Sequence, residues 1–248
     1  MKLEQVNGCR VDAPMVLKAA ASTYRGHPRL VVGLAVSVFG IAAVVDTLAH
    51  AIAHSAIEGK GLTVLAIALA GPVSASTTAL VFFAGVLDRL VSHHLFGHDK
   101  PTLVQTFRTL RWLRLLVADA VHMSFVGIGW VLGAVPGLLM FTLWCLIGSV
   151  INIEGATVLG ALRRSARLVR PRFWLAFVLV TLPATVESVV LHSLHFGGAN
   201  RPLLAAFAIS AVIGVSAGAV IGLVEVALAH LLISEERGTS LTPIKGLS

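Results

Sequence analysis

Charged side chains are scarce in this sequence. Asp, Glu, Lys and Arg account for 12% of its 248 residues, whereas a soluble domain contains roughly 25% charged residues. Hydrophobic residues account for 56%, and the mean hydropathy is +0.89. Because the few charges also gather in short segments, the composition excludes a soluble globular domain and indicates an integral membrane protein.

Cysteine is nearly absent, and so are the common catalytic motifs. Cys9 lies in a polar segment and Cys145 in an apolar run, so we expect them at different depths and predict no disulfide. The sequence lacks a Gly-x-Ser-x-Gly turn, a His-Glu-x-x-His motif, a phosphate-binding P-loop and a cysteine pair at metal-binding spacing. We therefore predict a protein that is not an enzyme and has no cofactor.

Long apolar runs are what the sequence does have. Each run is close to the roughly 20 residues that cross a bilayer as a helix. We predict an all-α, polytopic membrane protein with six transmembrane helices arranged as three hairpins, at about residues 30–53, 62–87, 115–134, 138–151, 173–194 and 203–232. A cytoplasmic N-terminal segment (1–29) precedes this domain (30–233), and a cytoplasmic tail (234–248) follows it.

The positions of the basic residues predict the orientation. Of the 19 Lys and Arg residues, all except Lys60 and Arg201 fall on one side of the six predicted spans. The positive-inside rule then places both termini in the cytoplasm, and we expect a bacterial plasma membrane. Because these residues lie at the ends of apolar runs, we expect them to contact phospholipid, and we expect no nucleic-acid partner.

Residues 153–172 carry five arginines between two apolar runs. On a helical wheel Val158, Leu162 and Val169 share one side, and Arg163, Arg167 and Arg170 share the opposite one. This pattern predicts an amphipathic helix in the membrane interface that faces anionic headgroups or a protein partner through Arg163, Arg164, Arg167, Arg170 and Arg172. Similar interfacial helices are expected at 16–24 and 101–113, so that one precedes each hairpin.

The residues around this helix resemble a known group of proteins. Glu154-Gly155 and the segment 161–168, ALRRSARL, are similar to a broad bacterial group of six-span proteins. It includes the YciC-like inner-membrane proteins and the membrane domain attached to some glycerophosphodiester phosphodiesterases. The resemblance implies the six-span layout over most of the chain. In the fused members a separate soluble domain performs catalysis, so the resemblance implies no phosphodiesterase activity here.

Ionisable residues within the predicted spans are candidate sites, because a charge at membrane depth is costly. Asp46, Glu187, Glu225, Asp119 and His122 are candidates for a substrate or ion path. Hydration at the span ends and hydrogen bonds between helices are the alternative. A second hypothesis is a metal site, because imidazole and carboxylate groups near the outer ends of the first and fifth spans suit zinc. Its ligands would include His50, His54, His192 and His195.

Two further features are structural candidates. Glu154, at the start of the basic helix, is expected either to complement the positive end of that helix or to hold the elbow between two helices. Gly214, Gly218 and Gly222 repeat at four-residue steps in the last apolar run, a pattern that permits close approach of helices. They serve either packing within the bundle or a homo-oligomer.

The function is therefore predicted only by class. The basic interfacial helices and the missing catalytic motifs favour a non-enzymatic plasma-membrane protein, an envelope-related accessory or scaffold component that binds lipids and protein partners. One alternative is a transporter or permease subunit whose intramembrane carboxylates line a path. The other is a membrane-embedded metal-binding or lipid-processing protein.

Overall fold

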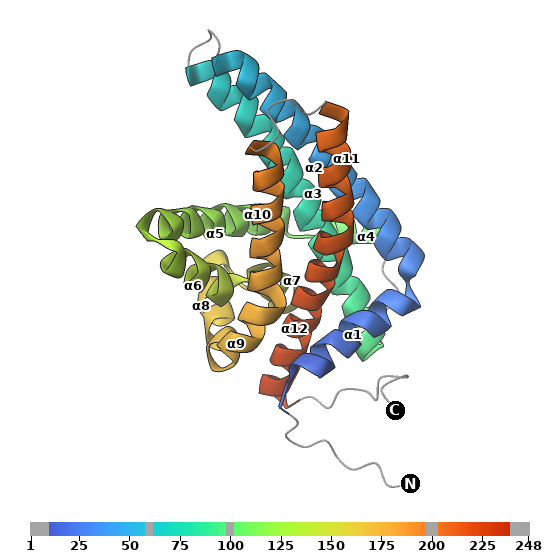
Figure 1. The fold of residues 1–248 in the computed structure, drawn as a ribbon. Coiled ribbons are helices and arrows are strands. Elements are labelled where there is room, and N and C mark those ends of the chain that lie inside the picture. Colours follow the sequence, from blue (N-terminus) through green and yellow to red (C-terminus); the bar gives the residue numbers. More distant parts are fainter. Residues whose placement is uncertain (1–9, 58–61, 98–101, 197–202, 239–248) are drawn as a thin grey trace.

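The computed structural model describes residues 10–57, 62–97, 102–196 and 203–238, and every element in these ranges is helical (Figure 1). The first half contains α1 (Ala13–Gly26), α2 (Pro28–Ile57), α3 (Leu62–Phe96), α4 (Leu103–Thr109) and α5 (Trp112–Leu132). The middle contains α6 (Ala134–Trp144), α7 (Ile147–Glu154), α8 (Val158–Val169) and the 3-10 turn η1 (Arg170–Arg172). The last part contains α9 (Phe173–Ala176), the π-helical turn η2 (Phe177–Thr181), α10 (Leu182–Phe196), α11 (Leu203–Ile213), the π-helical turn η3 (Gly214–Gly218) and α12 (Ala219–Arg237).

Six helical segments of the described chain are long and apolar enough to cross a membrane. They are Pro28–Val45, Thr78–Phe96, Trp112–Leu132, Ala134–Glu154, Val158–Leu191 and Phe207–Arg237. The prediction of an all-helical protein with six apolar segments of membrane-spanning length is confirmed.

The long helices form a column. Helix α2 packs along α3, α12 lies against α3 and α1, and α11 with η3 lies against α2. Helices α5 and α6 pack on each other, and in Figure 1 they extend sideways from this column. We call the end of the column where α1 begins and α12 ends the terminal end. The fully buried side chains of α3 and α12 gather towards it, including Leu87, Leu90, Leu228 and Leu231.

Local signals explain several helix limits. Asp12 caps α1, because the Met15 backbone N–H donates to Asp12 Oδ1 at 3.0 Å. The helix expected at 101–113 is shorter in the structure. Helix α4 ends at Thr109, because Leu110 has an extended backbone with ψ of 139°, and Trp112 already begins α5.

The expected span 138–151 is not one helix either. It is divided at Cys145 and Leu146 into α6 and α7. The last helix is longer than expected, since α12 continues past 232 to Arg237. Both departures involve charged or polar partners from distant parts of the chain.

The glycines that the sequence singled out lie against neighbouring helices. A Cβ atom added to Gly214 or Gly218 would contact the Phe39 ring of α2, and one added to Gly222 would contact Phe83 of α3. These positions favour packing within the bundle. A homo-oligomer through the same glycines stays an untested prediction.

Helices α5 and α6 approach each other closely at two glycines. A Cβ atom on Gly129 would lie 2.8 Å from Gly137 Cα and 2.9 Å from its backbone nitrogen. Backbone atoms cannot move aside as a flexible side chain can. We therefore expect Gly129→Ala to destabilise the protein by roughly 1–3 kcal/mol through overpacking, measured as a lower unfolding temperature in detergent.

Gly127 provides the matched control for Gly129. It lies on the same helix, and nothing lies within 4 Å of an added Cβ atom. Gly127→Ala should be neutral or stabilising by up to about 1 kcal/mol, because Ala is the better helix former. Equal unfolding temperatures for the two variants would contradict the assigned contact.

Candidate functional site

The basic helix is joined to α7 by a sharp elbow. Helix α7 ends at Glu154, and Gly155 follows in the left-handed region with φ of 69°. Helix α8 then begins behind Thr157, whose hydroxyl accepts from the Gly160 N–H at 3.3 Å. The positive φ is the reason that glycine suits this position. A Cβ atom there would also meet the guanidinium of Arg111, and the end of that side chain would have to move aside.

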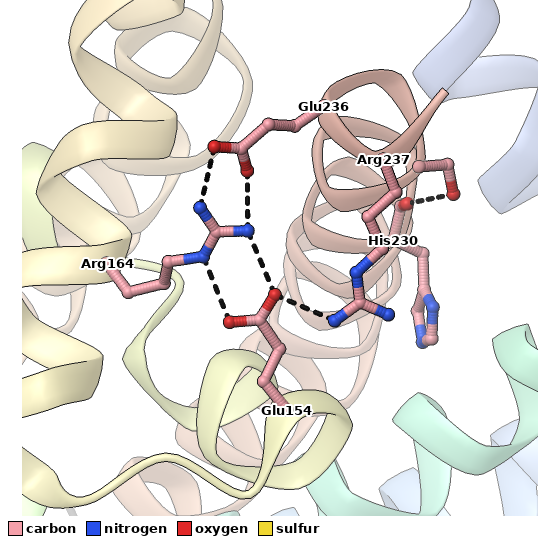
Figure 2. Close-up of polar contacts among 6 residues, drawn as sticks. Glu154, Arg164, His230, Glu236 and Arg237 are labelled. Carbon is pink, nitrogen blue, oxygen red and sulfur yellow. Dashed lines mark hydrogen bonds and ion pairs between the residues drawn. The ribbon is translucent and has the colours of Figure 1, made fainter. Parts of the chain in front are cut away.

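Glu154 lies at the centre of an ionic network of four side chains (Figure 2). Its Oε2 is 2.9 Å from Arg164 Nε, and its Oε1 is 3.0 Å from Arg164 Nη2 and 2.9 Å from Arg237 Nη2. Arg164 Nη1 also donates to Glu236 Oε1 at 2.7 Å. We call Glu154, Arg164, Glu236 and Arg237 the Glu154 network. It ties α7, α8 and the end of α12 together, in addition to any effect of the α8 dipole.

The five arginines of the basic segment divide into two groups. Arg164 belongs to the Glu154 network, and Arg172 Nη2 forms a second ion pair with Glu235 Oε1 at 2.5 Å. Arg163, Arg167 and Arg170 are exposed, and they form no ion pair within the described part of the chain. The exposed three are the ones available to a headgroup or partner.

The opposite face of α8 is buried, and it carries one hydroxyl. Ser165 is fully buried. Its Oγ donates to the Leu143 carbonyl at 2.9 Å and accepts from the Leu146 N–H at 3.3 Å. These are the backbone groups released where α6 and α7 separate. Ser165 therefore satisfies the broken helix, and this role explains why the span divides there.

A second buried polar pair lies between α3 and α12. His230 Nε2 is 3.0 Å from Asp88 Oδ1, and both residues are buried. The His230 ring also contacts Phe96. The sequence patterns did not single out either residue of this pair.

A cavity of about 570 Å³ opens beside this pair and the Glu154 network. Side chains of α3, α4, α7 and α12 line it together with Arg111. Three of the lining residues are arginines: Arg89, Arg111 and Arg237. Arg89 Nη2 donates to Thr109 Oγ1 at 2.8 Å. Sequence reasoning missed this cavity, and the only signal for it was the dense polar composition of 88–114.

The structure brings some of the predicted path residues together. Glu225 of α12 is close enough to Asp119 of α5, and to Asp88 of α3, to interact electrostatically with each of them. Glu187 is half-buried on α10, and no charge interaction with these acids is found for it in the described chain. His122 is buried against Phe141 and Trp144. The side chain of Asp46 lies outside the described residues.

The predicted metal ligands cannot be placed in the same way. The side chains of His50, His54, His192 and His195 lie outside the described residues. Among the side chains that are described, no three His, Cys, Asp or Glu residues form a group that could hold a metal ion. The metal site stays a prediction.

Comparison with known proteins adds no assignment. No protein-family model, curated protein or solved structure matches this chain.

The Glu154 network predicts a stability effect. Arg164 and Glu154 expose only 20% and 16% of their side chains, so Arg164→Gln leaves two carboxylates without their shared partner. We expect a loss of roughly 1–3 kcal/mol, between the values for exposed and buried ion pairs, measured by thermal or denaturant unfolding in one detergent. Arg163→Gln, the neighbouring exposed position, should change stability by less than about 0.5 kcal/mol. A similar loss in both variants would argue against a specific network.

Ser165 predicts a second effect. Ser165→Ala keeps the size of the buried site but leaves the Leu143 carbonyl and the Leu146 N–H unsatisfied, which should cost roughly 1–3 kcal/mol. Ser124 of α5 is a suitable control, because it is exposed and its hydroxyl bonds only the Ala120 carbonyl of its own helix at 2.7 Å. Ser124→Ala should be nearly neutral. Faster amide exchange around residues 143–146 in Ser165→Ala alone would locate the defect, and unchanged exchange there would contradict the role.

Proposed function

We propose that this chain is a non-enzymatic component of a bacterial plasma membrane, an accessory or scaffold protein that binds phospholipid and a protein partner at its terminal end. The proposal also includes cytoplasmic termini and three transmembrane hairpins, each preceded by an interfacial helix. The likeness of 154–168 to the YciC-like six-span group is consistent with it.

The observation that carries this proposal is the two-sided construction of α8. One face is buried through Ala161, Leu162, Leu168 and Val169. The other presents Arg163 and Arg167, and Arg170 follows directly in η1. These three arginines are exposed and form no ion pair within the described chain. Basic residues near an anionic membrane surface contribute about 1 kcal/mol each. Arg164 and Ser165 hold α8 against the rest of the protein, so the three exposed arginines have fixed positions.

A transport function is the second candidate. Its support is the electrostatic interaction of Glu225, an acid within an apolar helix, with Asp119 and with Asp88. Asp88 lines the cavity at the terminal end. Buried carboxylates of this kind are used as relays and ion sites in transporters. The absence of any charge interaction between Glu187 and this group within the described chain weakens the path that the sequence suggested.

The test uses the whole protein in nanodiscs of phosphatidylcholine with phosphatidylglycerol. We expect native mass spectrometry to detect retained phosphatidylglycerol. The triple variant Arg163→Gln, Arg167→Gln, Arg170→Gln should lose affinity for it on the order of a hundredfold, from about 1 kcal/mol per arginine. A triple Lys variant keeps the charge and should retain the lipid.

The same preparation tests the class of function. A protein partner that co-purifies in fixed stoichiometry would support the scaffold proposal. Solute uptake into liposomes that contain only this protein, or turnover of a lipid by it, would overturn the proposal in favour of transport or lipid processing.

A further inference from the structure

The cavity at the terminal end has an excess of positive charge. Arg89 and Arg111 line it and are exposed, and neither forms an ion pair within the described part of the chain. Arg237 forms an ion pair with Glu154. Asp88 supplies the carboxylate of the described lining, and its Oδ1 already faces His230 Nε2 at 3.0 Å. The two charged lining residues that are left without an ion pair, Arg89 and Arg111, are therefore both cationic.

A buried hydroxyl gives independent support for a ligand. Thr106 lines the cavity and exposes only 1% of its surface. Its Oγ1 has no hydrogen-bond partner among the described residues. An unsatisfied buried hydroxyl costs free energy, and native structures usually supply it with a partner. This hydroxyl is therefore a candidate hydrogen-bonding group for a ligand in the cavity that Thr106 borders.

The rest of the lining fits an anion with several acceptor atoms. Gln105 and Asn152 add amide groups, while Leu110 and Ile153 form an apolar part of the cavity wall. The volume of about 570 Å³ falls within the range of small-ligand pockets, roughly 300–1,000 Å³. Guanidinium groups bind phosphate oxygens through paired hydrogen bonds, and a threonine hydroxyl complements them.

We infer that this cavity binds a phosphate-bearing ligand, held by Arg89 and Arg111 and by the hydroxyl of Thr106. The phosphate comes either from the headgroup of an anionic phospholipid or from a soluble phosphate ester. This site is separate from the exposed arginines of α8, so it goes beyond the headgroup contacts proposed for that helix.

The test is ligand-dependent unfolding of the full chain in dodecyl maltoside, a detergent without phosphate. Phosphatidylglycerol and glycerol 3-phosphate serve as the two probes, and succinate at equal ionic strength serves as the carboxylate control. A ligand that binds only the folded state raises the unfolding temperature as its concentration rises. A shift with phosphatidylglycerol alone identifies a lipid site, and a shift with glycerol 3-phosphate identifies a soluble ligand; both support the inference.

Two variants connect the shift to the cavity. Arg89→Gln removes a charged donor and should raise the dissociation constant about tenfold or more, and Thr106→Val should raise it about threefold to tenfold. Thr106→Val is informative even if Arg89→Gln folds poorly, because this hydroxyl has no partner within the described chain. Its unliganded unfolding temperature should therefore equal or exceed that of the parent protein.

The α8 triple glutamine variant separates the two proposals. If it keeps the shift while Thr106→Val weakens it, the cavity is the site. No shift with either phosphate probe, an equal shift with succinate, or unchanged affinity in both cavity variants would overturn the inference. Loss of the shift only in the α8 variant would also overturn it, while leaving the proposed headgroup contacts of α8 intact.

Discussion

Glu154 is held by two guanidinium groups that come from different helices. Arg164 reaches it from α8 and Arg237 from α12, at 2.9 Å each. A carboxylate that exposes only 16% of its side chain needs such partners, because an unpaired charge in a poorly solvated place is costly. Once Glu154 is fixed at the end of α7, the direction in which α8 leaves the elbow and the position of the α12 end are fixed with it.

The order of residues in α8 follows from this constraint. Arg164 and Ser165 are adjacent, and both reach inward. Arg164 binds Glu154 and Glu236, whereas Ser165 satisfies the backbone where α6 and α7 separate. The positions around them, Arg163 and Arg167, are exposed. This one short helix therefore satisfies the backbone groups between α6 and α7 and anchors the end of α12. It also presents positive charge on its exposed face.

Composition and periodicity predicted those features that depend on local sequence. The six apolar helical segments are of this kind. The pair of Asp88 with His230 is not, because the two residues are 142 positions apart and each alone resembles an ordinary polar residue near a span end. The break at Cys145 was equally hidden, since hydropathy records an apolar run and does not register the hydroxyl of Ser165 that makes a break tolerable.

The polar cavity borders fully buried side chains of α3 and α12. Leu87 and Leu90, which flank Asp88 and Arg89 on α3, are fully buried. The same is true of Leu228 and Leu231 around His230 on α12. Close-packed side chains resist displacement, so the helix positions that carry these polar residues are held in place before any ligand arrives. A ligand would then lose little free energy in ordering its site, which is the property expected of a binding cavity rather than of a chance gap between helices.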